Sequence, residues 1–209
     1  IHVEEAAKHG RNLKLGEKRA EVVRRYLSQK GIALHRMSVI SYGESEQVAA
    51  FLDESERVLR PLNYGTHGVP GRGWGTYEAL DGSELAVVNL QGRTTMQPID
   101  NPFTDADRLL DEASEPLPPI RLVDFHCELT SEKNALGLYL DGRVSAVVGT
   151  HTHVVTGDER ILPKGTAYQS DTGMCGDYDS VVGMDKEEPM QRFLKKIKTN
   201  RYSAALGPA

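Results

Sequence analysis

The sequence predicts an α/β fold, and three consecutive segments in the second half of the chain are the reason. Residues 120–125 (IRLVDF) form a short apolar run typical of a buried strand, residues 130–142 open like a helix, and residues 144–148 (VSAVV) are again apolar. A strand, a helix and a strand in this order indicate a βαβ unit. We therefore expect these two strands to be parallel members of one sheet.

The N-terminal quarter of the chain predicts a further helix and strand. Residues 15–31 (LGEKRAEVVRRYLSQKG) place Ala20, Val23 and Leu27 on one face, which is the spacing of an amphipathic helix ending at a glycine. Residues 37–42 then predict a strand. A second helix is expected over residues 47–59.

The middle of the chain predicts a loop followed by a hairpin. The glycines and prolines of GTHGVPGRGWG (65–75) are incompatible with regular structure, so this segment is expected to be a loop. Two short runs at 77–80 and 84–90 flank the sequence DGS at 81–83, which is a hairpin signal.

The remaining signals are those of helix and turn. A helix is expected over residues 105–113, and Thr130 is a candidate N-terminal cap for the helix that follows the strand at 120–125. The DG pair at 141–142 turns the chain into the strand that ends at His151.

Composition bounds what the protein can be. With 209 residues, 39% hydrophobic and 26% charged, the chain has an ordinary globular composition and is long enough for one large or two small domains. No apolar run approaches the roughly 20 residues that span a bilayer, and no signal peptide opens the sequence. Cys127 and Cys175 lie outside any CxxC pair, so we expect free thiols and a cytoplasmic location.

Charge divides the chain near residue 45. Residues 1–45 carry nine Lys and Arg against five Asp and Glu, whereas the remainder carries 16 against 25. The change predicts two segments with different histories, residues 1–45 and 46–209. The basic residues lie on one helix without aromatic partners, so we expect no binding to a nucleic-acid duplex.

Three histidines follow the two strands of the predicted βαβ unit. His126 follows the first strand in VDFHCELTSEK, and His151 and His153 follow the second in GTHTH. The carboxyl ends of neighbouring parallel strands share one sheet edge, where ligands of open α/β sheets gather. Side chains of an extended segment alternate, so His151 and His153 would point the same way. The three imidazoles are therefore expected to converge as metal ligands.

Two carboxylates are candidates to support these ligands. Asp124 lies two residues before His126, on the same side of the strand, and could hold the imidazole tautomer that metal binding requires. Glu128 is a second candidate, with an exposed carboxylate at a helix start as the alternative. The residues that would carry catalysis stay unknown at this point.

Four longer motifs carry a resemblance to a known family. LRPLNYGTHGVPGRGW, LAVVNLQGRT, VDFHCELTSEKNALGLYLDGRVSAVVGTHTHV and DERILPKGTAYQSDTGMCGDYDSVVGM occur in this order between residues 59 and 184. Over about residues 46–209 the sequence resembles the YmdB-type bacterial metallophosphoesterases. The resemblance implies a calcineurin-like α/β sandwich, a two-metal centre and hydrolysis of phosphodiesters, notably 2′,3′-cyclic nucleotides. It also implies that His126, His151 and His153 are metal ligands.

The resemblance leaves part of the implied centre without a counterpart. The family takes further ligands from an N-terminal aspartate, a Glu-Asn pair and an Asn-His pair, but no GD strand exit, GEN or GNH occurs before residue 46. Two-metal catalysis uses carboxylates to bridge the cations and offset their charge. The sequence therefore predicts an incomplete sandwich, lacking these strands and the family's C-terminal end, and an impaired hydrolase.

The first 45 residues resemble a different family, the OmpA-like or Pal-type peptidoglycan-binding domain. That family holds peptidoglycan through an aspartate and the arginine of an Arg-Ala pair. Arg19 matches the arginine, and Glu4 stands at the aspartate position. The matching residues are Asn12-Leu13, Leu15, Arg19-Ala20, Val23, Leu27-Ser28, Gly31 and SYGES.

Three functions follow as expectations. The first is a metal-dependent hydrolase acting on a small phosphodiester, with a divalent cation that the ligand set does not identify as Fe, Mn or Zn. The alternatives are a peptidoglycan-associated binding module, which would be periplasmic, and a catalytically inactive chimera. Incomplete parallel sheets expose edges and apolar faces, so a chimera would also favour homo-oligomers.

Overall fold

A computed structural model describes residues 51–65, 68–114, 116–197 and 201–207. The chain divides into two compact units, one formed by residues 49–173 and the other by residues 1–48 and 174–209. The helix expected over residues 15–31 and the strand expected over 37–42 lie outside the described residues.

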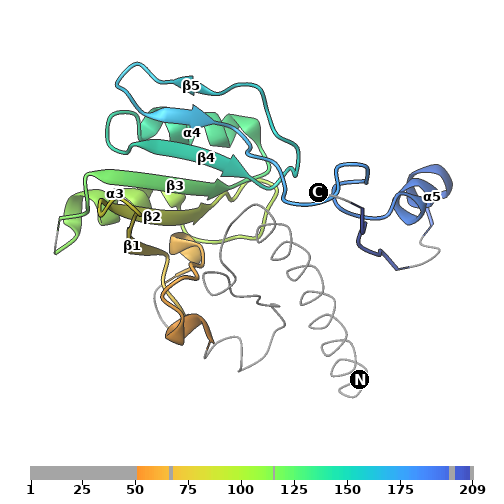
Figure 1. Ribbon diagram of the computed structural model, residues 1–209, viewed down its shortest axis with the longest axis horizontal. Helices are drawn as coiled ribbons and strands as arrows, with labels where there is room; N and C mark the ends of the chain where they lie inside the picture. The colour runs from red at the N-terminus through yellow and green to blue at the C-terminus, as the bar shows by residue number, and fades with distance from the viewer. Residues whose placement is uncertain (1–50, 66–67, 115, 198–200, 208–209) are drawn as a thin grey trace. The chain divides into compact units, whose positions relative to one another are not determined.

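The unit of residues 49–173 is built on one six-stranded mixed sheet (Figure 1). Strands β2, β3 and β4 run parallel in its centre, β6 extends them in parallel, and β1 and β5 pair antiparallel at the two edges. The strands are β1 Trp74–Glu78, β2 Glu84–Gln91, β3 Ile120–His126, β4 Ala146–Thr150, β5 Arg160–Ile161 and β6 Ala167–Gln169.

Two helices connect the central strands. Helix α3 (Pro102–Glu112) links β2 to β3, and α4 (Thr130–Tyr139) links β3 to β4. Successive parallel crossovers of the usual right-handed sense place their helices on the same face, and Figure 1 shows α3 and α4 behind the sheet. The βαβ unit predicted from the sequence is confirmed.

The core lies between this sheet face and the helices α3 and α4. Strand β2 alternates as its sequence ELAVVNLQ predicts, with Ala86, Val88 and Leu90 buried on one side. Leu136 of α4 and Leu140, which directly follows this helix, are fully buried. One glycine of β4 is required by close packing, because a Cβ at Gly149 would lie 1.8 Å from the backbone oxygen of Ser170.

Several element boundaries differ from the prediction, and each has a local cause. The helix expected over 47–59 ends at residue 54, because Leu59 bridges to Arg72 and a proline follows at residue 61. Strand β1 begins at Trp74, inside the predicted loop. Helix α3 begins three residues earlier than expected, because Asn101 caps it by accepting the Phe103 N–H at 3.1 Å.

The helix after β3 also starts differently from the expectation. Thr130 is its first helical residue rather than its cap, and the N-cap position belongs to Leu129, which makes no side-chain capping bond. The turn at 141–142 is confirmed, with Gly142 at φ 83°. Strand β4 ends at Thr150, so His151 is the first residue beyond it.

The other unit contributes one described helix, α5 (Glu187–Lys195), which the sequence reading did not predict. Met184 forms antiparallel bridges with Val181 and with Ala204 within this unit. In the described ranges of both units, every helix is too short or too polar to cross a membrane.

Candidate functional site

The three central strands end at one edge of the sheet and bring the candidate residues there. In the parallel register Gln91 pairs with His126, and His126 pairs with Thr150, so these residues lie side by side at the carboxyl ends of β2, β3 and β4. His151 follows directly. The prediction that His126 and His151 leave neighbouring parallel strands is confirmed.

A chain of hydrogen bonds runs across these strand ends behind His126. The Asp124 carboxylate accepts from the Asn89 amide (Nδ2 to Oδ2, 2.8 Å) and from the Thr150 hydroxyl (Oγ1 to Oδ1, 2.9 Å). The Thr150 oxygen also lies 3.1 Å from Nδ1 of His126. We call Asn89, Asp124 and Thr150 the Asp124 relay. Asp124 therefore reaches the His126 imidazole only through the Thr150 hydroxyl, and its role as the support of a metal ligand stays a prediction.

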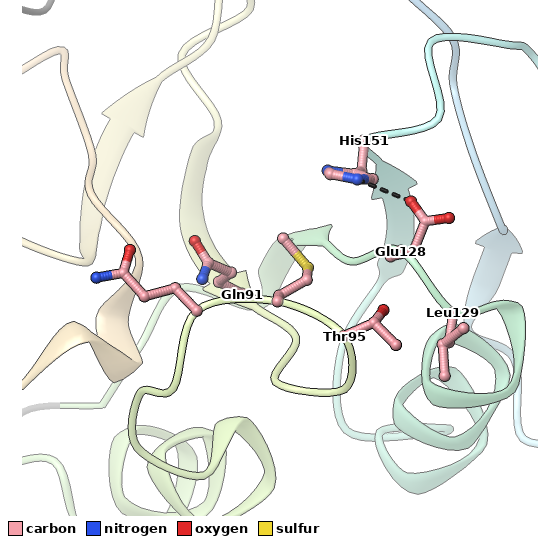
Figure 2. A pocket seen from close by; sticks show the side chains of 7 residues that line it. Gln91, Thr95, Glu128, Leu129 and His151 are labelled. Carbon is pink, nitrogen blue, oxygen red and sulfur yellow. Dashed lines mark ion pairs between the residues drawn. The ribbon is translucent and has the colours of Figure 1, made fainter. Parts of the chain in front are cut away.

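The imidazole of His151 faces that of His126. Nδ1 of His151 lies 3.0 Å from Nε2 of His126, and the rings meet edge to face with centroids 4.8 Å apart. The other ring nitrogen of His151, Nε2, lies 2.8 Å from Oε2 of Glu128 (Figure 2). Each imidazole therefore has a carboxylate behind its outer nitrogen, either directly or through a hydroxyl.

The hydrogen-bond partners fix where the ring protons lie. A carboxylate only accepts, so the single Thr150 hydroxyl proton goes to Asp124, and Nδ1 of His126 must donate to the Thr150 oxygen. By the same rule, Nε2 of His151 donates to Glu128. In the neutral rings, the two nitrogens that face each other across 3.0 Å then both carry lone pairs. Two acceptors at this distance are stable only with a proton or a cation between them.

The surroundings of His126 disfavour a proton there. Burial is the largest cause that lowers the pKa of His126, and the neighbouring His151 acts in the same direction, while Asp124 opposes them. A neutral imidazole with its outer nitrogen held as a donor is the form in which histidine binds metals. The pair therefore has the electronic character of two metal ligands.

The segment that carries His151 and His153 is bent rather than extended. His151 has φ 121° and His153 has φ 66°, both in the region that disfavours side chains other than glycine. The alternation that was expected to point both imidazoles the same way therefore does not apply, because the strand ends at Thr150.

A buried ion pair holds this bend in place. The Asp171 carboxylate accepts the Thr152 N–H at 2.9 Å and pairs with Nζ of Lys133 at 2.7 Å. Burial opposes ionisation of Asp171, but the bonds from Lys133, Thr152 and Gly173 lower its pKa. Backbone strain of order 1–3 kcal/mol per residue persists only where such contacts over-determine the conformation.

The metal site predicted from three histidines stays a prediction. His126 and His151 come together, but in the ranges that the structure covers no group of three or more His, Cys, Asp or Glu side chains is arranged to hold a metal ion. His153 has its own interaction and is not free. The described donor set therefore supplies two facing nitrogens.

A further carboxylate at the start of α4, which the sequence offered only as a weak candidate beside Glu128, shapes the neighbouring loop. Glu132 on α4 accepts the N–H groups of Arg93 (3.0 Å) and Thr94 (3.2 Å) and lies 3.3 Å from the Cys127 sulfur. Burial opposes the ionisation of Glu132, but these bonds lower its pKa. Burial raises the pKa of Cys127 to about 12, so this thiol is structural rather than reactive.

The sequence profile of the YmdB-like protein family matches residues 5–209. The chain is 48% identical over 199 residues to the 2′,3′-cyclic-nucleotide 2′-phosphodiesterase of Bacillus subtilis (strain 168), a match that covers 95% of this chain and 74% of that protein.

Two solved structures are similar in fold and sequence. A hypothetical protein from Thermus thermophilus has a TM-score of 0.71 and 47% identity, over 80% of this chain and 64% of that one. A phosphatase from Mycoplasma pneumoniae has a TM-score of 0.67 and 33% identity, over 78% of this chain and 58% of that one. This chain thus spans less than two thirds of either structure.

The comparisons give no support to a separate OmpA-like segment. The family match begins at residue 5 and so includes most of the segment that was expected to be distinct. Glu4 and Arg19, the expected peptidoglycan contacts, lie outside the described residues. Peptidoglycan binding and self-association stay predictions without further support.

Proposed function

Because the chain belongs to the YmdB-like family, we propose that it is a metal-dependent phosphodiester hydrolase whose substrates are nucleoside 2′,3′-cyclic phosphates. The similar Bacillus subtilis protein is named for this activity, and a similar solved structure is a phosphatase. The mixed α/β sheet with helices on one face is consistent with half of a calcineurin-like sandwich. The pair His126 and His151 is the observation that carries the proposal.

The residues present fit a divalent cation. Nδ1 of His151 and Nε2 of His126 face each other 3.0 Å apart and both offer lone pairs, so these two nitrogens would hold the ion. Imidazole ligands suit Zn, Mn and Fe alike, so the pair does not identify the metal. His153 is the proposed third ligand.

Each partner has a defined role in this function. A bound divalent cation would polarise a phosphoryl oxygen and stabilise negative charge in the transition state. Glu128 and the Asp124 relay keep the outer ring nitrogens protonated, so that the inner ones face the ligand. The Lys133–Asp171 pair holds the Thr152 N–H and with it the bend that carries His151.

Metal titration combined with hydrolysis tests the proposal. Mn²⁺ and Zn²⁺ binding to the purified protein is measured by calorimetry, and hydrolysis of 2′,3′-cyclic AMP is measured at each metal concentration. We expect saturable binding and metal-dependent hydrolysis, both lost in His151→Ala. Full binding and turnover in His151→Ala would overturn the assignment of this ligand.

Two glutamates provide a matched control. Glu128→Gln keeps the size of the side chain but weakens its hold on Nε2 of His151, so metal affinity should fall by about 10–100-fold. Glu159→Gln makes the same change at an exposed position that is absent from the site, and its affinity should equal that of the unmodified protein. Equal affinities for both variants would show that Glu128 does not support the ligand.

A further inference from the structure

A pocket of about 580 Å³ opens beside the His126–His151 pair. His151, Glu128 and Leu129 line one side, and Gln91 and Thr95 lie across from them (Figure 2). The remaining lining residues are Met96 and Gln97. Its volume is within the roughly 300–1,000 Å³ of small-molecule sites.

One buried amide fixes both ends of the loop that forms the far wall. Asn63 is fully buried, and its side chain accepts the Gln91 N–H at 3.0 Å while donating to the Gln91 carbonyl at 2.8 Å. The same amide donates to the Asp100 carbonyl at 2.9 Å. These bonds therefore hold the two ends of the segment from residue 91 to residue 100 close together. We call this segment the 91–100 loop.

A second clamp holds the middle of this loop. The Glu132 carboxylate accepts the N–H groups of Arg93 and Thr94, and Thr95 directly follows Thr94. Thr95 itself has φ 63°, which is strained for a residue with a branched side chain. The contacts of Asn63 and Glu132 hold the loop on both sides of Thr95, so the strained backbone there is retained. These contacts therefore constrain the positions of the loop side chains that line the pocket.

Besides the phosphodiester at the histidine pair, the pocket lining disfavours a further anionic group of the ligand and favours a flat, neutral group. Among the described residues that line the pocket there is no Lys or Arg, and the one charged side chain, Glu128, is negative. The carboxamides of Gln91 and Gln97 each offer two donors and an acceptor, which is the pattern that pairs with nucleobase edges. Met96 and Leu129 supply apolar surface, and a thioether packs well against an aromatic ring.

We propose that this pocket binds the nucleobase of the substrate, with Gln97 and Met96 as specificity-determining residues. This inference rests on the proposed function for the position of the phosphodiester, which would lie at the His126–His151 pair. The pocket then distinguishes a nucleoside cyclic phosphate from a cyclic phosphate that has no base. It also disfavours oligonucleotides whose next phosphate would enter the pocket.

Binding of adenosine in the absence of metal tests the pocket separately from catalysis. Saturation-transfer NMR with adenosine is compared for the unmodified protein, Gln97→Leu, Met96→Ala and Leu80→Ala. Loss of one neutral hydrogen bond or apolar contact should raise the Kd by about two- to tenfold in the first two variants. Leu80 is 90% exposed in the β1–β2 turn and serves as the control, for which no change is expected.

Hydrolysis supplies the second measurement. With Mn²⁺ present, kcat/KM is measured for 2′,3′-cyclic AMP and for ribose 2′,3′-cyclic phosphate, and the ratio of the two values is the readout. We expect a ratio well above one that falls in Gln97→Leu and in Met96→Ala. Thermal unfolding of each variant verifies that it is folded.

The outcomes separate the two proposals. Adenosine binding that weakens in Gln97→Leu, without any metal-dependent hydrolysis, would support the base pocket and sink the proposed function. Hydrolysis with a ratio near one and no adenosine binding would support the function and overturn the base pocket. Adenosine binding that is equal in all four proteins would also overturn it, because the base would then lie elsewhere.

Discussion

Two polar pairs lie near the carboxyl edge of the sheet, and they differ in one chemical respect. Lys133 and Asp171 meet at 2.7 Å with both side chains 1% exposed, and they match a donor with an acceptor. His126 and His151 meet at 3.0 Å, and their partners leave an acceptor facing an acceptor. The first pair is complete within the protein, whereas the second needs a proton or a cation.

This difference separates a pair that is satisfied within the fold from the pair proposed to bind a metal, and it does so without reference to any relative. A buried, fully satisfied ion pair makes local structure specific, and removing one partner leaves an uncompensated charge. A pair of lone pairs held face to face costs stability unless a ligand occupies the gap, and natural proteins tolerate such conflicts mainly at functional sites. The following predictions test the two halves of this comparison.

The largest effect is expected for the structural pair. Lys133→Met should lower the free energy of unfolding by about 3–5 kcal/mol, because it leaves the Asp171 carboxylate buried and unpaired. Chemical denaturation of the two proteins measures the difference. Lys133→Met/Asp171→Leu should recover part of the loss, since it removes the buried charge as well. A loss below about 1 kcal/mol in the single variant would mean that the pair behaves as a surface pair.

The next effect concerns His126 and His151, the proposed metal ligands, and should leave stability nearly unchanged. Thr150→Val removes the hydroxyl that accepts from Nδ1 of His126, so the ring loses the bond that fixes its tautomer. Metal affinity should fall by about 10–100-fold. Thr150→Ser keeps the hydroxyl and should retain the affinity.

Long-range ¹H–¹⁵N NMR correlations provide the direct readout. In the unmodified protein without metal, the neutral His126 ring should carry its proton on Nδ1. In Thr150→Val the ring should become a mixture of tautomers. An unchanged tautomer in Thr150→Val, together with unchanged affinity, would remove the Asp124 relay from the metal-binding proposal.

The sequence predicted one of these pairs better than the other. His126 and His151 could be found because both follow apolar strands, and a parallel βαβ unit places such positions at one edge. The role of Thr150 could not be found, because it depends on a register that pairs it with His126 and brings its hydroxyl to Asp124. Lys133 and Asp171 are 38 residues apart, and a lysine on a helix is usually solvent-exposed.

The bend after β4 shows a different limit. An H-x-H sequence predicts two side chains on one side only if the backbone stays extended, and here the strand ends one residue before His151. The prediction from side-chain alternation was therefore applied to residues that lie beyond the end of the strand. The short strands β5 and β6 were also missed, because two- and three-residue strands have no detectable periodicity.

A smaller effect is expected from pH. The folded-state pKa of Asp171 is lowered, so its contribution to stability is present above the unfolded pKa of about 3.9 and is lost as pH falls through the folded value. The stability difference between the unmodified protein and Lys133→Met should therefore narrow at acid pH. Denaturation curves at several pH values between 3 and 7 measure it. A difference that grows on acidification would have the wrong sign for a depressed carboxyl pKa.

The smallest effect is expected for an ion pair that is partly open to solvent, and it shows whether burial is the reason for the strength of the Lys133–Asp171 pair. Arg143 contacts Asp107 at 2.7 Å and Asp111 at 2.8 Å, with good geometry but with these carboxylates 33% and 62% exposed. Exposed pairs typically contribute ~0.2–1 kcal/mol, and salt screens them. Arg143→Met should therefore cost less than about 1 kcal/mol, and the cost should shrink further in 1 M NaCl. The Lys133→Met difference should hardly change with salt, because solvent ions do not reach that pair. If both differences respond to salt alike, burial does not distinguish the two pairs, and the structural role assigned to Lys133 and Asp171 is wrong.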